Sequence, residues 1–355
     1  MSDLGQDEAE EDTDRDNPST GDESSSASPS TASATTTATP EPPAEDAPEE
    51  DEGDADSTDA DTAEPESSTR VVEHALGTSE IPTRPERIVV MDPGTILPTL
   101  LTFDLPIVAA PLPAEPFPTV LVDEDDLAMI ASVGLSDVSL ELVAAAQPDL
   151  IVGFDAGLTD TYDQLTQIAP TVAVGLDLND WRATAEEIGR VVGIDEEMAE
   201  ALAEYDARVA QLRADLGPAI DTEVSVVRAL GQLIRLHTRF HFAGQVLDDV
   251  GLARPATQQT DDPETRLIQI SLEDLGQADG DILFVFGAGS LGSLGGDEVD
   301  LTIQAITEHP LFPTLRVAQN DAVVVVDPLG WQQGGLPAAN LILDDLERAL
   351  VGSSS

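Results

Sequence analysis

The 355-residue chain contains no cysteine and no lysine, and aromatic residues make up only 3% of it. Without cysteine there is no disulfide framework and no thiolate chemistry. No run of apolar residues approaches the ~20 that a membrane-spanning helix needs. Because lysine is absent, the basic side chains are 15 arginines, against 70 acidic residues, and the formal net charge is −55. This charge argues against nucleic acid and against an anionic membrane surface as partners.

The first 69 residues differ in composition from the rest. They carry 23 acidic side chains against Arg15 alone, with almost no large apolar residue and abundant Ser, Thr, Ala and Pro. Such a segment cannot bury enough apolar surface to offset its chain entropy, so we expect residues 1–69 to form a disordered, self-repelling spacer. The remaining 286 residues hold 47 acids and 14 arginines. A lysine-free acidic surface suits a protein that meets high salt, which screens self-repulsion, although high genomic GC content would give the same bias.

No secretory signal precedes the acidic spacer, which follows Met1 directly. Two explanations are open: the protein is cytoplasmic, or an export segment has been left out of this sequence. A long spacer ahead of a compact domain is what a tethered surface protein needs. We therefore expect an extracytoplasmic, membrane-tethered protein, with its export signal and lipid-attachment cysteine outside this sequence.

A segment near the middle of the chain recurs 132 residues later. Residues 139–141 read Ser-Leu-Glu and lead to Asp149 and an apolar run, and residues 271–273 lead at the same spacing to Asp281. Each copy predicts a short helix with Ser at its N-cap and Glu in its first turn, followed by a buried strand. A period this long is too large for a solenoid, so we expect two similar lobes with a cleft between them.

Predicted strands alternate with predicted helices on both sides of one long helical stretch. We expect an N-terminal α/β lobe at residues 70–190, an interlobe helix at 191–217 and a C-terminal α/β lobe at 218–351. The alternation predicts parallel sheets covered on both faces. A helix from about Asp195 to Leu216 would run roughly 33 Å, long enough to brace the lobes. The predicted fold is α/β: two Rossmann-like lobes joined by one long bracing α-helix, with a ligand cleft between the lobes.

The order of several motifs resembles the substrate-binding proteins of ABC importers, of the class with a rigid interlobe helix that takes up ferric siderophores, cobalamin or haem. The matching pieces include Pro85-Glu86-Arg87-Ile88-Val89, Pro148-Asp149-Leu150-Ile151-Val152, Val246-Leu247-Asp248-Asp249-Val250-Gly251-Leu252 and His309-Pro310-Leu311. The resemblance covers about residues 70–351 and is strongest to actinobacterial and archaeal iron-siderophore binders. It implies a class III periplasmic-binding-protein-like fold, no enzymatic activity, no resident cofactor or metal, a monomer, and an ABC permease with its ATPase as partners.

The same family uses one glutamate per lobe to dock on Arg-rich pockets of the permease. Glu141 and Glu273 match those positions. The alternative is that each is a first-turn glutamate that interacts only with its own helix dipole. Their equivalent places in a repeat favour docking.

Three arginines, Arg228, Arg235 and Arg239, lie within twelve positions of an otherwise acidic lobe. A ferric complex with catecholate or carboxylate arms is anionic, and guanidinium offers several donors and a charge that does not titrate away. We expect Arg228 at the end of the first strand of the second lobe, where a parallel sheet presents its ligands, with the other two on the following hairpin or loop. The alternative is that all three neutralise neighbouring acids.

Further residues are assigned to the same site. The resemblance implies an aromatic ring against the ligand where Trp331 stands, although a lone loop tryptophan is more often a packing residue. Asp92, which follows the first strand of the first lobe, is also included. His237 and His241 are four residues apart and could ligate a transition metal or haem iron; histidines without any ligand are the alternative. Family members often have Tyr at the position of His237.

One enzyme-like pattern remains. Gly287, Gly289 and Gly292 follow a predicted strand with the spacing of a dinucleotide-binding turn, but neither an apolar helix nor a basic group comes next, so we interpret the run as a flexible loop at the cleft mouth. The sequence offers no convincing nucleophile, base or metal cage.

The main prediction is an extracytoplasmic ABC-transporter component that binds a ferric siderophore. Binding of haem or cobalamin, and a cytoplasmic α/β enzyme with an acidic tail, are the alternatives.

Overall fold

The computed structural model describes residues 68–113, 120–231, 233–287 and 297–352. The chain divides into two units, and the second, Ala63–Ser355, holds all of the described residues. The predicted spacer up to residue 67 and the glycine run from 288 to 296 lie outside the described part. Within that part, no helix combines the length and apolarity that a membrane span requires.

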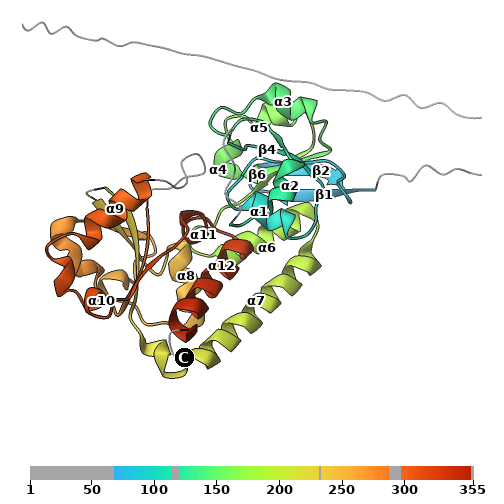
Figure 1. The fold of residues 1–355 in the computed structure, drawn as a ribbon. Helices are drawn as coiled ribbons and strands as arrows, with labels where there is room; N and C mark the ends of the chain where they lie inside the picture. Colours follow the sequence, from blue (N-terminus) through green and yellow to red (C-terminus); the bar gives the residue numbers. More distant parts are fainter. Residues whose placement is uncertain (1–67, 114–119, 232, 288–296, 353–355) are drawn as a thin grey trace, which may run out of the picture. The chain divides into compact units, whose positions relative to one another are not determined.

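The first lobe is built on a five-stranded parallel sheet with the strand order β5-β4-β3-β6-β7 (Figure 1). Its strands are β3 (Ile88–Val90), β4 (Ile107–Ala110), β5 (Ala131–Ser132), β6 (Leu150–Phe154) and β7 (Thr171–Val174). Its helices are α1 (Ile96–Leu101), α2 (Glu124–Ala128), α3 (Leu140–Ala145), α4 (Asp155–Leu158), α5 (Tyr162–Leu165) and α6 (Trp181–Val192). An antiparallel hairpin of β1 (Thr69–His74) and β2 (Gly77–Pro82) precedes the sheet. The central strand β3 is apolar and buried throughout, and its neighbour β6 is buried up to Phe154, as expected of parallel strands covered on both faces.

The second lobe has a five-stranded mixed sheet with the order β10-β9-β8-β11-β12. Its strands are β8 (Val224–Leu230), β9 (Leu233–His237), β10 (Leu267–Ser271), β11 (Ile282–Phe286) and β12 (Val323–Val325). Its helical segments are η1 (Gly217–Asp221), α8 (Phe242–Val250), η2 (Ala256–Gln258), η3 (Leu272–Ala278), α9 (Asp297–Thr307), η4 (Phe312–Thr314), α10 (Arg316–Gln319), α11 (Pro328–Gln332), α12 (Leu336–Leu346) and η5 (Glu347–Val351). Strand β9 runs antiparallel to both neighbours, which corrects the expectation of an entirely parallel sheet, because a short hairpin at Gly231 reverses the chain.

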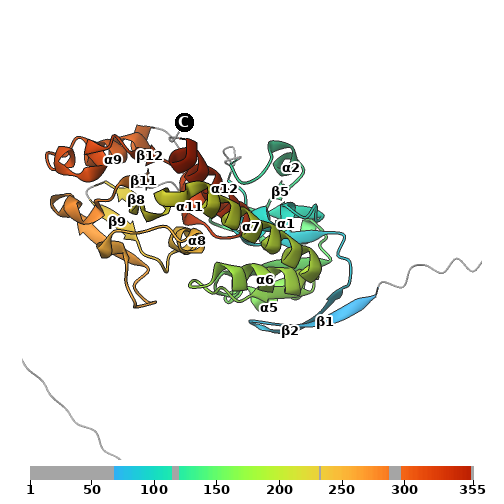
Figure 2. The same ribbon diagram turned by 90° about the horizontal axis from the view of Figure 1, so that it is seen from below.

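A single long helix, α7 (Asp195–Leu216), connects the lobes. It starts after Gly193, which adopts φ +88° and ends α6, and its first turn carries three acids that favour the positive end of the helix dipole. Its buried residues recur every three or four positions; they are Met198, Leu202, Tyr205, Val209, Leu212 and Leu216. Figures 1 and 2 show α7 beside α12 and extending from one lobe to the other. The predicted two-lobed α/β fold with a bracing helix is confirmed.

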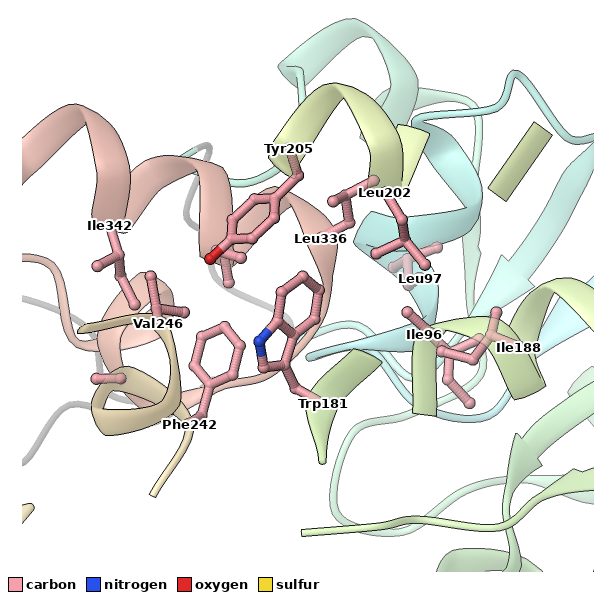
Figure 3. Close-up of a cluster of buried hydrophobic side chains, with 14 of the residues drawn as sticks. Ile96, Leu97, Trp181, Ile188, Leu202, Tyr205, Phe242, Val246, Leu336 and Ile342 are labelled. Atoms are coloured by element: carbon pink, nitrogen blue, oxygen red, sulfur yellow. The ribbon is translucent and has the colours of Figure 1, made fainter. Parts of the chain in front are cut away.

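The two lobes share one apolar core around this helix. Figure 3 shows side chains from both lobes converging on Trp181: Ile96, Leu97 and Ile188 from the first lobe, Leu202 and Tyr205 from α7, and Phe242, Val246, Leu336 and Ile342 from the second. The Trp181 ring meets the edges of Tyr205 and Phe242 at centroid distances of 5.1 and 6.1 Å. Because close-packed interiors resist deformation, this shared core favours small relative movements of the lobes.

The repeated aspartate has the same structural task in each lobe. Asp149 accepts hydrogen bonds from the backbone N–H groups of Glu86 (2.7 Å) and Arg87 (2.9 Å), just before β3. Asp281 accepts one from Glu223 (2.9 Å), just before β8. Strands β3 and β8 are central in their sheets, so each carboxylate fixes the start of a central strand beside its neighbour.

Candidate ligand-binding site

A cavity of about 210 Å³ lies between the lobes. Its lining from the first lobe consists of Asp92, Thr95, Phe154, Leu176, Asp177, Leu178, Trp181 and Thr184, and from the second lobe of Phe242, Gln245, Arg266, Gln332, Gln333, Gly334 and Gly335. Apolar and aromatic side chains with a few polar and charged groups among them are typical of small-molecule sites. The cavity is therefore the candidate binding site.

Hydrogen bonds connect the two sides of this cavity. The side chain of Gln245 accepts from the backbone N–H of Trp181 (3.0 Å) and donates to the carbonyl oxygen of Leu178 (3.0 Å). On the other side, the N–H of Gly334 donates to the hydroxyl of Thr95 (3.2 Å). The lobes are thus already bonded to each other in this conformation.

Asp92 is the one predicted ligand-binding residue among the described residues that line the cavity. It follows β3, and its Oδ1 atom accepts N–H bonds from Thr95 (2.7 Å) and Ile96 (2.8 Å). Burial raises the pKa of this carboxyl above its ordinary value, while the backbone donors act in the opposite direction. Asp92 therefore holds the turn into α1 and also forms part of the cavity wall.

Arg266 supplies the guanidinium of the described cavity lining. Its Nε atom donates to the carbonyl oxygen of Phe240 (3.2 Å). Burial lowers its pKa from the ordinary arginine value, and the charge of Asp177 opposes this. No local pattern predicts Arg266 as a site residue, because its place depends on the pairing of β10 with β9. The backbone N–H of Thr238, just after β9, donates to the carbonyl oxygen of Arg266 (3.1 Å), just before β10.

Arg228 and Arg235 face each other across the hairpin of β8 and β9. Arg228 is the fifth of the seven residues of β8 and not at its end, which corrects its expected position. Burial, and secondarily the charge of Arg235, lowers the pKa of Arg228. The Nε atom of Arg228 is buried without a hydrogen-bond partner among the described residues. Neither arginine belongs to the described lining of the cavity.

His237 and His241 form a buried pair whose ring centroids lie 3.8 Å apart. Neither ring nitrogen of His237, nor Nδ1 of His241, has a hydrogen-bond partner within the described residues. Burial, reinforced by neighbouring positive groups, lowers the pKa of His237 well below its ordinary value and that of His241 to about 3. Both rings are therefore neutral at neutral pH, which is the state in which imidazole ligates a metal. Both are also closed to solvent, and for this reason the conformation does not favour them as ligands of a metal or haem iron. No group of three or more potential metal ligands occurs in the part of the chain that is described.

Four arginines lie around the histidine pair. Arg228, Arg254 and Arg266 all act on the pair and lower its pKa values, and Arg235 pairs with Arg228 across the hairpin. Among the described residues, no ion pair within 4.0 Å includes any of the four, although the charges of Asp248 and Asp177 reach Arg254 and Arg266. Other described arginines also lack an ion pair, so what distinguishes these four is their proximity to one another in a chain with a net charge of −55. This set, called the arginine cluster below, makes the region attractive to an anion.

Two other predicted ligand residues lie elsewhere. Arg239 forms an ion pair with Asp248 (2.8 Å), which agrees with the alternative that it neutralises an acid. Trp331 is 0% exposed, stacks on Phe284 at 4.7 Å and donates its indole N–H to Asp345 (2.8 Å). Trp331 is therefore a core residue, and this corrects the expectation that it faces the ligand.

Glu141 and Glu273 are both exposed in the first turns of α3 and η3. Each carboxylate is close to its own backbone N–H and to the serine at the start of its helix, and these hydrogen bonds lower both pKa values. Both lie in equivalent first turns, as the repeat predicts, but the serines differ: Ser139 accepts from the N–H of Leu142 and donates to Glu141, whereas Ser271 donates to Asp274. The local geometry fits both a docking role and a capping role.

Comparison with known proteins decides the family. Residues 117–329, more than half of the chain, match the family model for periplasmic binding proteins. The chain belongs to this family. It is a binding protein and not an enzyme, which confirms that part of the prediction.

Relatives of this periplasmic binding protein are named for siderophores. The chain is 32% identical over 289 residues to the probable siderophore-binding lipoprotein YfiY of Bacillus subtilis strain 168, covering 79% of this chain and 87% of YfiY. It is 29% identical over 275 residues to the ferric enterobactin-binding periplasmic protein FepB of Escherichia coli, covering 72% and 82%. The crystal structure of Staphylococcus aureus SirA complexed with staphyloferrin B superimposes with a TM-score of 0.66 at 25% identity, covering 79% of this chain and 98% of SirA.

Proposed function

We propose that the protein is the extracytoplasmic solute-binding component of an ABC transporter, and that it binds an anionic iron(III)–siderophore complex in the interlobe cavity. The observation that carries this proposal is the arginine cluster around the histidine pair, which contributes Arg266 to the cavity wall. Carboxylate and catecholate groups match the donor geometry of guanidinium. The same substrate class is supported by the relatives: YfiY is named as siderophore-binding, FepB as ferric enterobactin-binding, and SirA was crystallised with staphyloferrin B.

In this proposal the iron arrives already chelated, and the protein supplies donors to the chelator and no ligand to the metal. No resident cofactor is needed. The burial of His237 and His241, which closes both rings to solvent, supports this view over coordination of haem iron. The binding of haem or cobalamin is therefore the less favoured alternative.

The proposal also covers the partners and the location. The bound complex would be delivered to a permease with its ATPase, with Glu141 and Glu273 as the docking contacts. We further propose a monomer that is held at the outer face of a membrane, because relatives include a lipoprotein and the first 69 residues have the composition of a spacer. Fractionation of cells that express the complete gene tests the tether.

A fluorescence titration tests the ligand. In the full chain carrying Trp331→Phe, Trp181 is the one remaining tryptophan, and it lines the cavity. Iron(III) complexes of a tricatecholate and of a citrate-type carboxylate should change its fluorescence at micromolar concentration or below, and a neutral trihydroxamate complex should bind more weakly. The titrations are repeated in low and high salt, with haem and cobalamin in parallel. The proposal fails if no ferric complex binds in either salt.

A further inference from the structure

Two leucines on one loop of the cavity wall are held in contact with solvent. Leu176 is 40% exposed and Leu178 is 47% exposed, and both line the cavity from the loop that connects β7 to α6. Leucine side chains of the first lobe are otherwise packed into its core at many positions. Apolar side chains that line a concave site usually contact the apolar part of its ligand.

The exposure of these leucines is not a consequence of a loosely held loop. The N–H of Asp177 donates to the hydroxyl of Thr184 (3.1 Å), and that hydroxyl lies 3.2 Å from the carbonyl oxygen of Asp177. The N–H of Asn179 donates to Asp177 Oδ1 (2.9 Å), and the carbonyl of Leu178 accepts from Gln245 (3.0 Å). The backbone is therefore held at Asp177, Leu178 and Asn179, next to or at each leucine.

The apolar surface extends beyond the two leucines. Phe154, at the end of β6, and the edges of Trp181 and Phe242 also line the cavity. Arg266 lines the same cavity, and the charge of Asp177 reaches it. The site thus combines an apolar wall, mainly from the first lobe, with a cationic region in the second lobe.

We infer that the ligand is amphiphilic: an anionic iron(III) chelate that carries an aliphatic arm, with the chelate at Arg266 and the arm on Leu176 and Leu178. This inference rests on the proposed function and specifies the ligand of that site. An aliphatic arm removes the two leucines from water, and each buried methylene group strengthens binding. A chelate without such an arm would leave this wall exposed.

A pair of matched probes tests the inference. The full chain is titrated with the iron(III) complexes of a citrate-based dihydroxamate siderophore bearing acetyl arms and of its analogue bearing eight-carbon acyl arms. The wild-type protein should bind the long-armed complex at least tenfold more tightly. In the double variant Leu176→Asn/Leu178→Asn the ratio of the two affinities should fall close to one.

Leu311→Asn is the control, because Leu311 is also 40% exposed and lies on the second lobe outside the cavity lining. It should keep the wild-type ratio. Equal binding of both complexes by the wild-type protein overturns the inference and leaves the proposed function standing. A tenfold preference that survives in the double variant also overturns it, because the arm would then bind elsewhere or the leucines would serve a protein partner. Absence of binding by either complex, and by every other ferric siderophore, contradicts the proposed function itself.

Discussion

The backbone N–H of Trp181, in the first lobe, donates a 3.0 Å hydrogen bond to the side chain of Gln245, in the second lobe. The same side chain donates to the carbonyl of Leu178 in the first lobe and to that of Phe240 in its own lobe (3.2 Å). One amide side chain therefore satisfies three backbone groups on both sides of the cavity. Gln245 connects the lobes in the wall that the ligand would touch.

Replacing this amide should loosen the interlobe contact. Gln245→Ala leaves three backbone groups without their partner, and we expect the free energy of unfolding to fall by about 1–3 kcal/mol. Hydrogen exchange should become faster around residues 176–182 and 240–245. Gln211→Ala is the matched control, since its amide bonds only Asp215 one turn along α7. Equal exchange in Gln245→Ala and wild type would show that the bond does not hold the lobes together.

Arg266 should contribute to ligand affinity, whereas Arg239 should not. Arg266→Gln removes the charge of the cavity wall, and loss of charge-assisted hydrogen bonds should weaken binding of an anionic ferric complex at least tenfold. Arg239→Gln removes a charge that is already paired with Asp248, so its effect should stay within about threefold. Fluorescence titration of Trp181 measures both. Similar losses in the two variants would indicate a general electrostatic effect rather than a contact at Arg266.

The buried histidine pair should make the fold sensitive to mild acid. Because the folded pKa values of His237 and His241 lie below the ordinary value of 6.5, the unfolded chain binds more protons below that pH. Stability is therefore lost as pH falls through 6.5, by up to about 1.4 kcal/mol per pH unit for each histidine. Urea unfolding at pH 7.5, 6.5 and 5.5 measures this slope.

The variant His237→Phe separates the histidine effect from the titration of carboxylates, because the carboxylates are the same in the variant and in the wild type. The phenyl ring keeps an aromatic contact with Phe286, which now meets His237 edge-on at 5.2 Å, and cannot take up a proton. The difference in stability between variant and wild type should shift in favour of the variant as pH falls from 7.5 to 5.5. His309→Gln, on a partly exposed histidine, should leave the slope close to that of the wild type. A slope that is the same in all three proteins would contradict the argument.

Charge reversal of Glu141 and Glu273 tests docking. Both carboxylates are exposed and far from any role in the core, so Glu141→Arg/Glu273→Arg should keep the ligand affinity and the unfolding midpoint. Uptake of the iron complex by cells that carry the matching permease should be lost. Glu196→Arg/Glu200→Arg, two exposed positions on α7, should leave uptake intact. Reduced ligand affinity in the first variant would assign the two glutamates to a different role.

The features that could be predicted from the sequence alone are those that depend on residues close together in the chain. Helix α7 carries its apolar residues at helical spacing, and the repeat places Glu141 and Glu273 in equivalent first turns. The repeat predicted two lobes correctly because its aspartates have the same role in each lobe. Asp149 and Asp281 each accept a hydrogen bond from the backbone just before a central strand.

The cavity lining depends on contacts between segments that are distant in the sequence, so most of its residues could not be predicted from sequence patterns. Gln245 and Arg266 enter the site only through the packing of α8 and the pairing of β10. Trp331 follows a strand and resembles a loop residue in sequence. Its acceptor Asp345 lies on α12, 14 residues further on, and this contact, invisible in the local sequence, places the ring in the core.

The polypeptide passes from the first lobe to the second through α7, and this has a consequence for the order in which the cavity is formed during synthesis. All strands of the first sheet precede α7 in the sequence, and all strands of the second sheet follow it, so the first lobe can pair its strands before the second has been synthesised. Gln332–Gly335, which form part of the cavity lining, come after the last strand, β12. A chain that ends near residue 327 therefore holds every strand of both lobes and still has an incomplete cavity. The cavity lining is thus completed by the segment that joins α11 to α12, after the sheets are complete.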